Sequence, residues 1–122
     1  MNNFLIIFLS LFSIFTQASS YEFSVMTLNV QNLFDTLDDP KKDDKAYLPI
    51  KKKQSKEHQK SCEKINVKSW KDECMFMDWN EETKDIKLRN LVKNIISYDN
   101  VGPDVLGLQE VENLNILRQL FN

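Results

Sequence analysis

The sequence is poor in residues that break regular structure and in side chains that commonly carry catalysis. Its 122 residues include two glycines, three prolines, two cysteines and one histidine. The scarcity of glycine and proline, with a hydrophobic fraction of 42%, argues against a wholly disordered or low-complexity chain. Lysine plus arginine number 16 against 18 acids, a formal charge of −2. This balance predicts neither a strong field for nucleic acid nor an acidic tail.

Charge is absent from the first twenty residues. Residues 4–15 form a dense run of Phe, Leu and Ile, and small residues follow it. The run is shorter than the roughly 20 apolar residues of a membrane span and is typical of a signal-peptide core. We predict a signal peptide over residues 1–20, cut after Ala18 or Ser20, and a secreted or periplasmic protein. An uncleaved N-terminal anchor is the alternative, and the missing Lys or Arg near the start is a departure from the usual pattern.

The two cysteines, Cys62 and Cys74, follow this segment. In an oxidising compartment a disulfide between them is favoured over two free thiols, and it would contribute about 3 kcal/mol by constraining the unfolded chain. A zinc site is disfavoured, because the sequence has no Cys-x-x-Cys pair at a suitable spacing from His58. We expect His58 to be a surface residue.

The chain after the signal peptide divides into patterned and unpatterned parts. Residues 21–30 are rich in β-branched and aromatic residues and predict a strand that ends near Asn29. Residues 35–79 are dense in charge and lack a sustained period, which predicts a long loop, with an insertion at about 41–79. Its lysines could steer a polyanionic substrate, but interleaved acids favour a merely solvated loop.

A helical pattern begins at Glu81 and a short apolar strand follows it at 104–109. The helix places apolar residues at spacings of three and four, which build one face: Ile86, Leu88, Leu91, Val92, Ile95 and Ile96. Strand, helix, strand is the order of a βαβ crossover, in which the strands are parallel. A second helix is expected after Asn113, a good N-cap. The fold class is therefore α/β.

Polar residues stand where both predicted strands end. Asn29 closes the first strand, and Gln109 and Glu110 close the second. Because ligands bind beyond the carboxyl ends of parallel strands, Glu110 could hold a hard divalent cation. Mg²⁺ is commonly bound through one or two carboxylates plus substrate phosphate. The alternative is a strand that ends in acids because it meets water.

Two stretches carry a family resemblance: "FSVMTLNVQNLFD" (23–35) and "PDVLGLQEVEN" (103–113). They resemble the first two signature motifs of the endonuclease/exonuclease/phosphatase superfamily of metal-dependent phosphoesterases, the deoxyribonuclease-I-like fold. The likeness is to the exported bacterial branch, in which the first motif continues with acids and a proline, as in "NVQNLFDTLDDP". "KLRNLVKNI" (87–95) is similar to the intervening helix. The resemblance covers roughly residues 23–40 and 84–117.

The resemblance implies a four-layer α/β sandwich of two sheets flanked by helices. It implies hydrolysis of a phosphodiester substrate, possibly DNA or RNA, in which Mg²⁺ or Mn²⁺ polarises the phosphoryl group. By this analogy Glu110 is the metal ligand and Asn29 orients phosphate or metal-bound ligands. Gln109 supports the site or is an ordinary strand residue facing the other layer. Asn32 and Asp35 lie at the same rim, where a turn role is favoured over substrate contact.

The sequence also departs from the family. Members need an activating His supported by an Asp near their far end, and His58 lies upstream of the Glu110 motif. We therefore expect an N-terminal fragment that needs the missing C-terminal half of the domain and is inactive alone. No stable protein partner is predicted. The leading hypothesis is a secreted endonuclease. The alternatives are a phosphatase or phospholipid phosphodiesterase of the superfamily, and a non-catalytic exported binding module.

Overall fold

The computed structural model describes residues 20–122. The predicted signal peptide therefore lies outside the described residues, except for Ser20. Within residues 20–122, no helix has both the length and the apolar character needed to cross a membrane.

The described chain contains a parallel pair of strands joined by a helical crossover. Strand β1 (Val25–Leu33) pairs in parallel with β2 (Val105–Val111), with Val25 opposite Val105 and Asn29 opposite Gln109. Helix α3 (Glu81–Ile96) precedes β2, and α4 (Leu114–Leu120) follows it. The Asn113 side chain caps α4 by accepting the Ile116 N–H at 3.0 Å. The predicted α/β class, βαβ order and capped second helix are confirmed.

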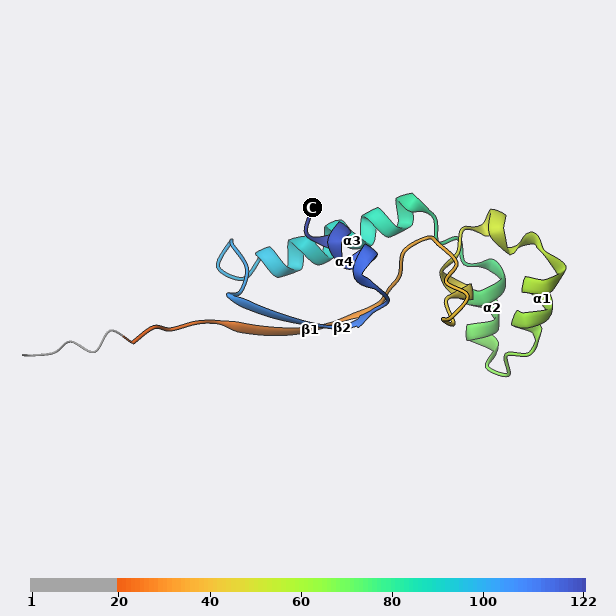
Figure 1. Cartoon of the computed structure of the whole chain (residues 1–122), viewed down its shortest axis with the longest axis horizontal. Helices are drawn as coiled ribbons and strands as arrows, with labels where there is room; N and C mark the ends of the chain where they lie inside the picture. The colour runs from red at the N-terminus through yellow and green to blue at the C-terminus, as the bar shows by residue number, and fades with distance from the viewer. Residues whose placement is uncertain (1–19) are drawn as a thin grey trace, which may run out of the picture.

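Helices α3 and α4 cover one face of the strand pair (Figure 1). We call these four elements the sheet unit. Its core combines residues from both layers: Val30, Leu33, Leu88, Leu91, Ile95, Ile116 and Leu120. The apolar face predicted for α3 is only partly buried, because Ile86 and Ile96 stay 46% and 44% exposed. On the other face of the strands Val25 and Thr27 are exposed. The described residues thus form two layers.

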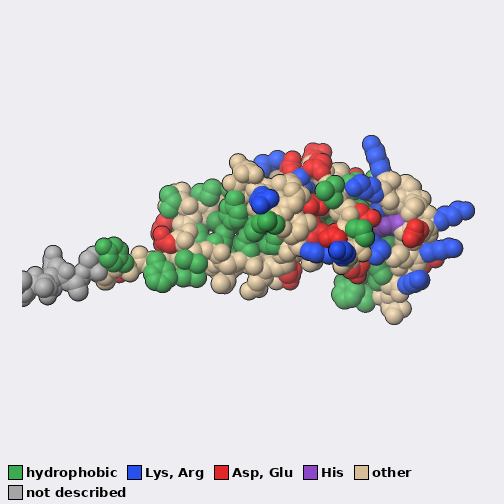
Figure 2. All heavy atoms as spheres, in the orientation of Figure 1, with side chains coloured by type: hydrophobic (Ala, Val, Ile, Leu, Met, Phe, Trp, Pro, Cys, Tyr) green, Lys and Arg blue, Asp and Glu red, His purple; other side chains and the backbone are tan. Residues whose placement is uncertain are grey.

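The predicted loop over 35–79 is largely wrong, because residues 45–77 fold into short helices. These are η1 (Lys45–Tyr47), η2 (Ile50–Gln54), α1 (Lys56–Glu63) and α2 (Lys68–Phe76). We call residues 45–77 the helical unit. It lies beside the carboxyl ends of the strands (Figure 1). Several of its basic side chains project into solvent, while apolar side chains gather over the sheet unit (Figure 2).

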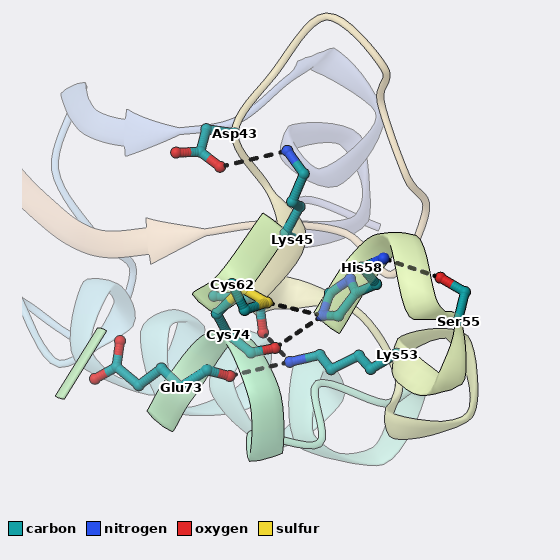
Figure 3. Close-up of a disulfide and its surroundings, with 9 residues drawn as sticks. Asp43, Lys45, Lys53, Ser55, His58, Cys62, Glu73 and Cys74 are labelled. Carbon is teal, nitrogen blue, oxygen red and sulfur yellow. Dashed lines mark hydrogen bonds and ion pairs between the residues drawn. A yellow bond between two sulfur atoms is a disulfide. The ribbon is translucent and has the colours of Figure 1, made fainter. Parts of the chain in front are cut away.

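The Cys62–Cys74 disulfide joins α1 to α2, which confirms the predicted bridge and is consistent with an oxidising compartment. His58 is buried against it, so its predicted surface position is wrong. Its Nε2 lies 2.9 Å from the Cys74 carbonyl oxygen and 3.2 Å from Cys62 Sγ (Figure 3). Because a carbonyl oxygen only accepts, this contact assigns the imidazole proton to Nε2. The interior of this unit is therefore partly polar.

Lys53 is a second polar group buried in the helical unit. Its exposed fraction is 2%, and its Nζ donates to the carbonyl oxygens of Ala46 at 2.8 Å and Glu73 at 3.1 Å (Figure 3). Burial lowers the pKa of this ammonium to about 8, against the opposing charge of Asp78. The Lys53 ammonium thus lies in the interior of the helical unit, where an apolar side chain is usual, and two carbonyl oxygens compensate its burial.

Candidate metal site at the strand ends

The two strand ends bring Asn29 and Glu110 into direct contact. Parallel pairing runs regularly from Val25 to Asn29, is interrupted by a bulge, and resumes at Leu33 opposite Val111. Within the bulge, Asn29 Nδ2 donates to Glu110 Oε1 at 2.6 Å, and the Asn32 N–H donates to Glu110 Oε2 at 3.1 Å. The predicted meeting of an amide and a carboxylate at one rim is present in the structure.

The Asn29 amide has a fixed orientation. Its Oδ1 accepts the backbone N–H of Gln31 at 2.7 Å, which leaves Nδ2 directed at the carboxylate. Asn29 therefore positions Glu110. Each oxygen of Glu110 receives one hydrogen bond, and a carboxylate oxygen has capacity for a second partner. The exposed carboxylate can bind a cation without losing its support.

The backbone around the site adopts a conformation that side-chain-bearing residues rarely take. Gln31, Asn32 and Glu110 have φ values of 52°, 60° and 63°. A left-handed residue other than glycine costs on the order of 1–3 kcal/mol, and such residues cluster at functional sites. Asn tolerates this region, but Gln31 and Glu110 have no such preference. In this strained backbone conformation the Glu110 carboxylate contacts the Asn29 side chain and the Asn32 N–H.

Lys87 of α3, more than fifty residues away in the sequence, stabilises the bulge through hydrogen bonds. Its Nζ donates to the Gln31 carbonyl oxygen and to the Asn32 carbonyl oxygen, the latter at 3.2 Å, and lies 5.5 Å from the centre of the Trp79 ring. Burial lowers the pKa of Lys87, and the negative charge of Glu110 opposes this shift. Sequence reasoning missed this role, because a lysine on an amphipathic helix normally faces solvent.

A depression of about 370 Å³ opens beside Glu110. Its lining includes three acidic residues, Asp43, Glu110 and Glu112, against a single lysine, Lys42. Glu112 is 9% exposed, and within residues 20–122 its Oε1 has no hydrogen-bond partner. An unpartnered buried carboxylate oxygen is costly. Burial raises the pKa of Glu112. With three acids against one lysine, the lining of the depression is acidic overall.

Asp35 fixes the loop behind the depression. Its backbone N–H donates to Glu112 Oε2 at 2.9 Å, and its own carboxylate accepts hydrogen bonds from Asn113 at 3.2 Å and Asn115 at 2.8 Å. Burial alone would raise the pKa of Asp35, but these hydrogen bonds and one from the Leu37 N–H lower it overall. The favoured turn roles of Asp35 and Asn32 agree with these contacts.

Gln109 lies opposite Asn29 in the strand register and is exposed. Within residues 20–122, its side chain has no hydrogen bond to Glu110 or to another residue of the site. Its supporting role therefore stays a prediction, as does its alternative role as a strand residue facing another layer.

The helical unit approaches the site through three aromatic rings. Tyr47 stacks on Phe34 with ring centres 4.2 Å apart and meets Trp79 edge-on at 5.5 Å. The Trp79 indole also donates to the Phe34 carbonyl oxygen at 3.1 Å. This contact ties residues 45–77 to the segment that leaves β1 at the candidate site.

A second set of ligand-type side chains lies in the helical unit. The ligand atoms of His58, Cys62 and Cys74 lie within 4.8 Å of one another, and all three residues are buried. Both sulfurs belong to the disulfide, so the oxidised protein offers only the imidazole there. Soft sulfur and nitrogen ligands are also unsuited to Mg²⁺.

Comparison with known proteins identifies no relative. A scan against protein-family models, a search of curated proteins and a search of solved structures each find no match. The chain is an α/β protein with a parallel strand pair, and its functional interpretation rests on its own residues.

Proposed function

We propose that this chain carries the metal-binding part of an exported phosphodiester hydrolase of the endonuclease/exonuclease/phosphatase superfamily, with an endonuclease as the leading case. The proposal includes the four-layer sandwich, of which the two layers described would be one half. The arrangement of Glu110 carries it: an exposed carboxylate at the ends of parallel strands, held by Asn29 and by the Asn32 N–H. The disulfide supports the exported location.

The oxygen-rich site fits Mg²⁺ or Mn²⁺, because hard cations take carboxylate oxygen and keep sites open for substrate phosphate. Glu110 would hold the cation, and the unpartnered oxygen of Glu112 adds negative potential at the same depression. When bound, the cation would supply Lewis-acid polarisation of a phosphoryl oxygen. Asn29 and the Asn32 N–H keep the Glu110 carboxylate in place, and Lys87 holds the bulge that carries them.

The sequence's one histidine lies in the disulfide cluster of the helical unit. We therefore do not assign it as the group that activates the attacking water. Metal binding, not turnover, tests the proposal. We expect Mg²⁺ or Mn²⁺ at a hundred times its dissociation constant to stabilise the full chain by about 2.7 kcal/mol.

Glu110→Gln should abolish this stabilisation, and Glu63→Gln, which removes an equal charge from an exposed position in α1, should leave it unchanged. Thermal unfolding of the three proteins with and without metal provides the measurement. Equal metal responses in the two variants would refute the assignment of Glu110. Indifference of the wild-type chain to both metals would favour the non-catalytic binding module.

A further inference from the structure

The two parts of the chain carry opposite charge, although the total is close to neutral. The helical unit contains nine lysines, two aspartate or glutamate residues in α1 and two in α2, a formal charge of +5. The rest of the chain has seven basic and fourteen acidic residues, a charge of −7. Since these fields do not cancel locally, a polyanion would experience the helical unit as a basic surface.

The lysines of this unit surround a hollow. A cavity of about 700 Å³ lies against η2 and α1, and five lysines line it, which define what we call the lysine cavity: Lys45, Lys52, Lys56, Lys60 and Lys64. Asp38 and Glu57 also line it, with His58. Lysine side chains project from this end of the molecule (Figure 2). The lining remains net positive after both acids are counted.

Three of these lysines form a row. Lys56, Lys60 and Lys64 recur every fourth residue from the first residue of α1 to its C-cap, so they lie on one side of the helix. At 1.5 Å per residue the row is about 12 Å long, and a B-form strand presents a phosphate about every 3.4 Å along the axis. Three or four successive phosphates therefore match the length of the row.

None of the three row lysines forms an ion pair within the described chain. Across residues 20–122, ion pairs involve Lys45, Lys68 and Lys84 only. Like charges at four-residue spacing on a helix cost about 0.2–0.5 kcal/mol per pair. Lys56, Lys60 and Lys64 therefore repel one another, and an anion seated in the cavity would relieve that repulsion.

The lysine side chains of the cavity and a nearby tryptophan ring indicate which class of anion would bind there. All five residues are lysines, which act as hydrated point charges and suit an extended backbone better than a single phosphate held bidentately. The adjoining depression shares Lys45 with the cavity and is lined also by Asn32, Trp70 and two acids, Asp43 and Glu73. Trp70 is 62% exposed. An exposed indole close to a basic cavity can serve as a stacking platform for a base.

We propose that the lysine cavity binds the phosphodiester backbone of a nucleic-acid strand, with Trp70 stacking on a base. The choice of nucleic acid among polyanions rests on the proposed function. The binding site is separate from Glu110 and needs no metal.

The test is fluorescence anisotropy of a labelled single-stranded DNA oligonucleotide with the full chain in EDTA, over a series of salt concentrations. Lys56→Gln/Lys60→Gln/Lys64→Gln should weaken binding at least about tenfold at low salt and reduce the slope of log K against log salt by about 2. Trp70→Ala should weaken binding severalfold.

The control is Lys41→Gln/Arg89→Gln/Lys93→Gln, which removes the same charge from exposed positions outside the helical unit and should change affinity less than threefold. Circular dichroism and thermal unfolding check that each variant folds, and the row variant should be no less stable than the wild type. Equal losses in both triple variants would overturn the proposal, as would the absence of wild-type binding in 50 mM salt.

Two further results separate the possible failures. If metal stabilisation is absent while row-dependent DNA binding persists, the proposed function fails and this site stands. If instead the row lysines govern sedimentation with phosphatidylserine vesicles and not DNA binding, the site belongs to a membrane surface and the proposal is wrong.

Discussion

The sheet unit and the helical unit are stabilised by different chemistry. The sheet unit buries a cluster of aliphatic side chains between its strands and helices. The helical unit buries a disulfide, an imidazole and an ammonium, and tolerates the repulsion of its lysines. We infer that apolar burial stabilises the sheet unit, whereas a disulfide and specific hydrogen bonds stabilise the helical unit.

The largest expected effect is on the sheet unit. Leu33 is completely buried, so Leu33→Ala should cost about 2–5 kcal/mol of unfolding free energy through lost burial and a residual cavity. Amide hydrogen exchange should accelerate in β1, β2 and α3 and remain slower in α1 and α2, which the disulfide retains. Uniform acceleration throughout the chain would show that the two units unfold together.

The converse experiment removes the disulfide. Cys62→Ser/Cys74→Ser should destabilise the helical unit by about 3 kcal/mol, because the unfolded loop regains entropy. Exchange should become fast in α1 and α2 while Leu88 and Leu91 of α3 keep their protection. Unchanged exchange in α1 would contradict the role assigned to the disulfide.

Lys53 predicts a pH dependence specific to the helical unit. The unfolded lysine holds its proton up to about pH 10.5, whereas the folded one releases it near pH 8. Between these values the unfolded state binds more protons, so the unfolding free energy should rise with pH, by at most about 1.4 kcal/mol per pH unit. Chemical denaturation at pH 7.5 and 9.5 measures this, and Lys53→Met should flatten the dependence. An equal rise in that variant would exclude Lys53 as its source.

The smallest expected effects come from the helix caps. Ser55 accepts the His58 N–H at the start of α1, and Asn80 accepts the Thr83 N–H at the start of α3. Each alanine substitution should cost about 1 kcal/mol. Amide hydrogen exchange should become faster in the helical unit for Ser55→Ala and in the sheet unit for Asn80→Ala. A response in the opposite unit would contradict the division of the molecule.

The sequence predicted the sheet unit because its periodicities are apolar. The spacing of Leu88, Leu91 and Ile95 indicated α3, and Asn113 indicated the start of α4. The helical unit escaped prediction because its helices are short and its buried residues include His58 and Lys53, which are polar types normally found outside. The pairing of Cys62 with Cys74 was predictable, but the helices that it joins were not.

The candidate site was predictable to the level of strand ends. The predicted parallel pairing of the two strands placed Asn29 and Glu110 at one edge of the sheet. In the structure, Asn29 Nδ2 lies 2.6 Å from Glu110 Oε1. The bulge, the left-handed backbone of Gln31 and Glu110, and the support from Lys87 were not predictable. They arise from tertiary contacts between segments more than fifty residues apart.

The proposed divalent-cation site lies at Glu110, where the two strands end. Mn²⁺ is paramagnetic, so titration of the full chain with substoichiometric Mn²⁺, followed by NMR line broadening, locates the bound ion directly. We expect the backbone amides of residues 29–32 and 110–112 to broaden first and Glu110→Gln to remove this effect. Broadening that begins at the acidic residues 38–44 or 81–85, with residues 29–32 unaffected, would contradict it.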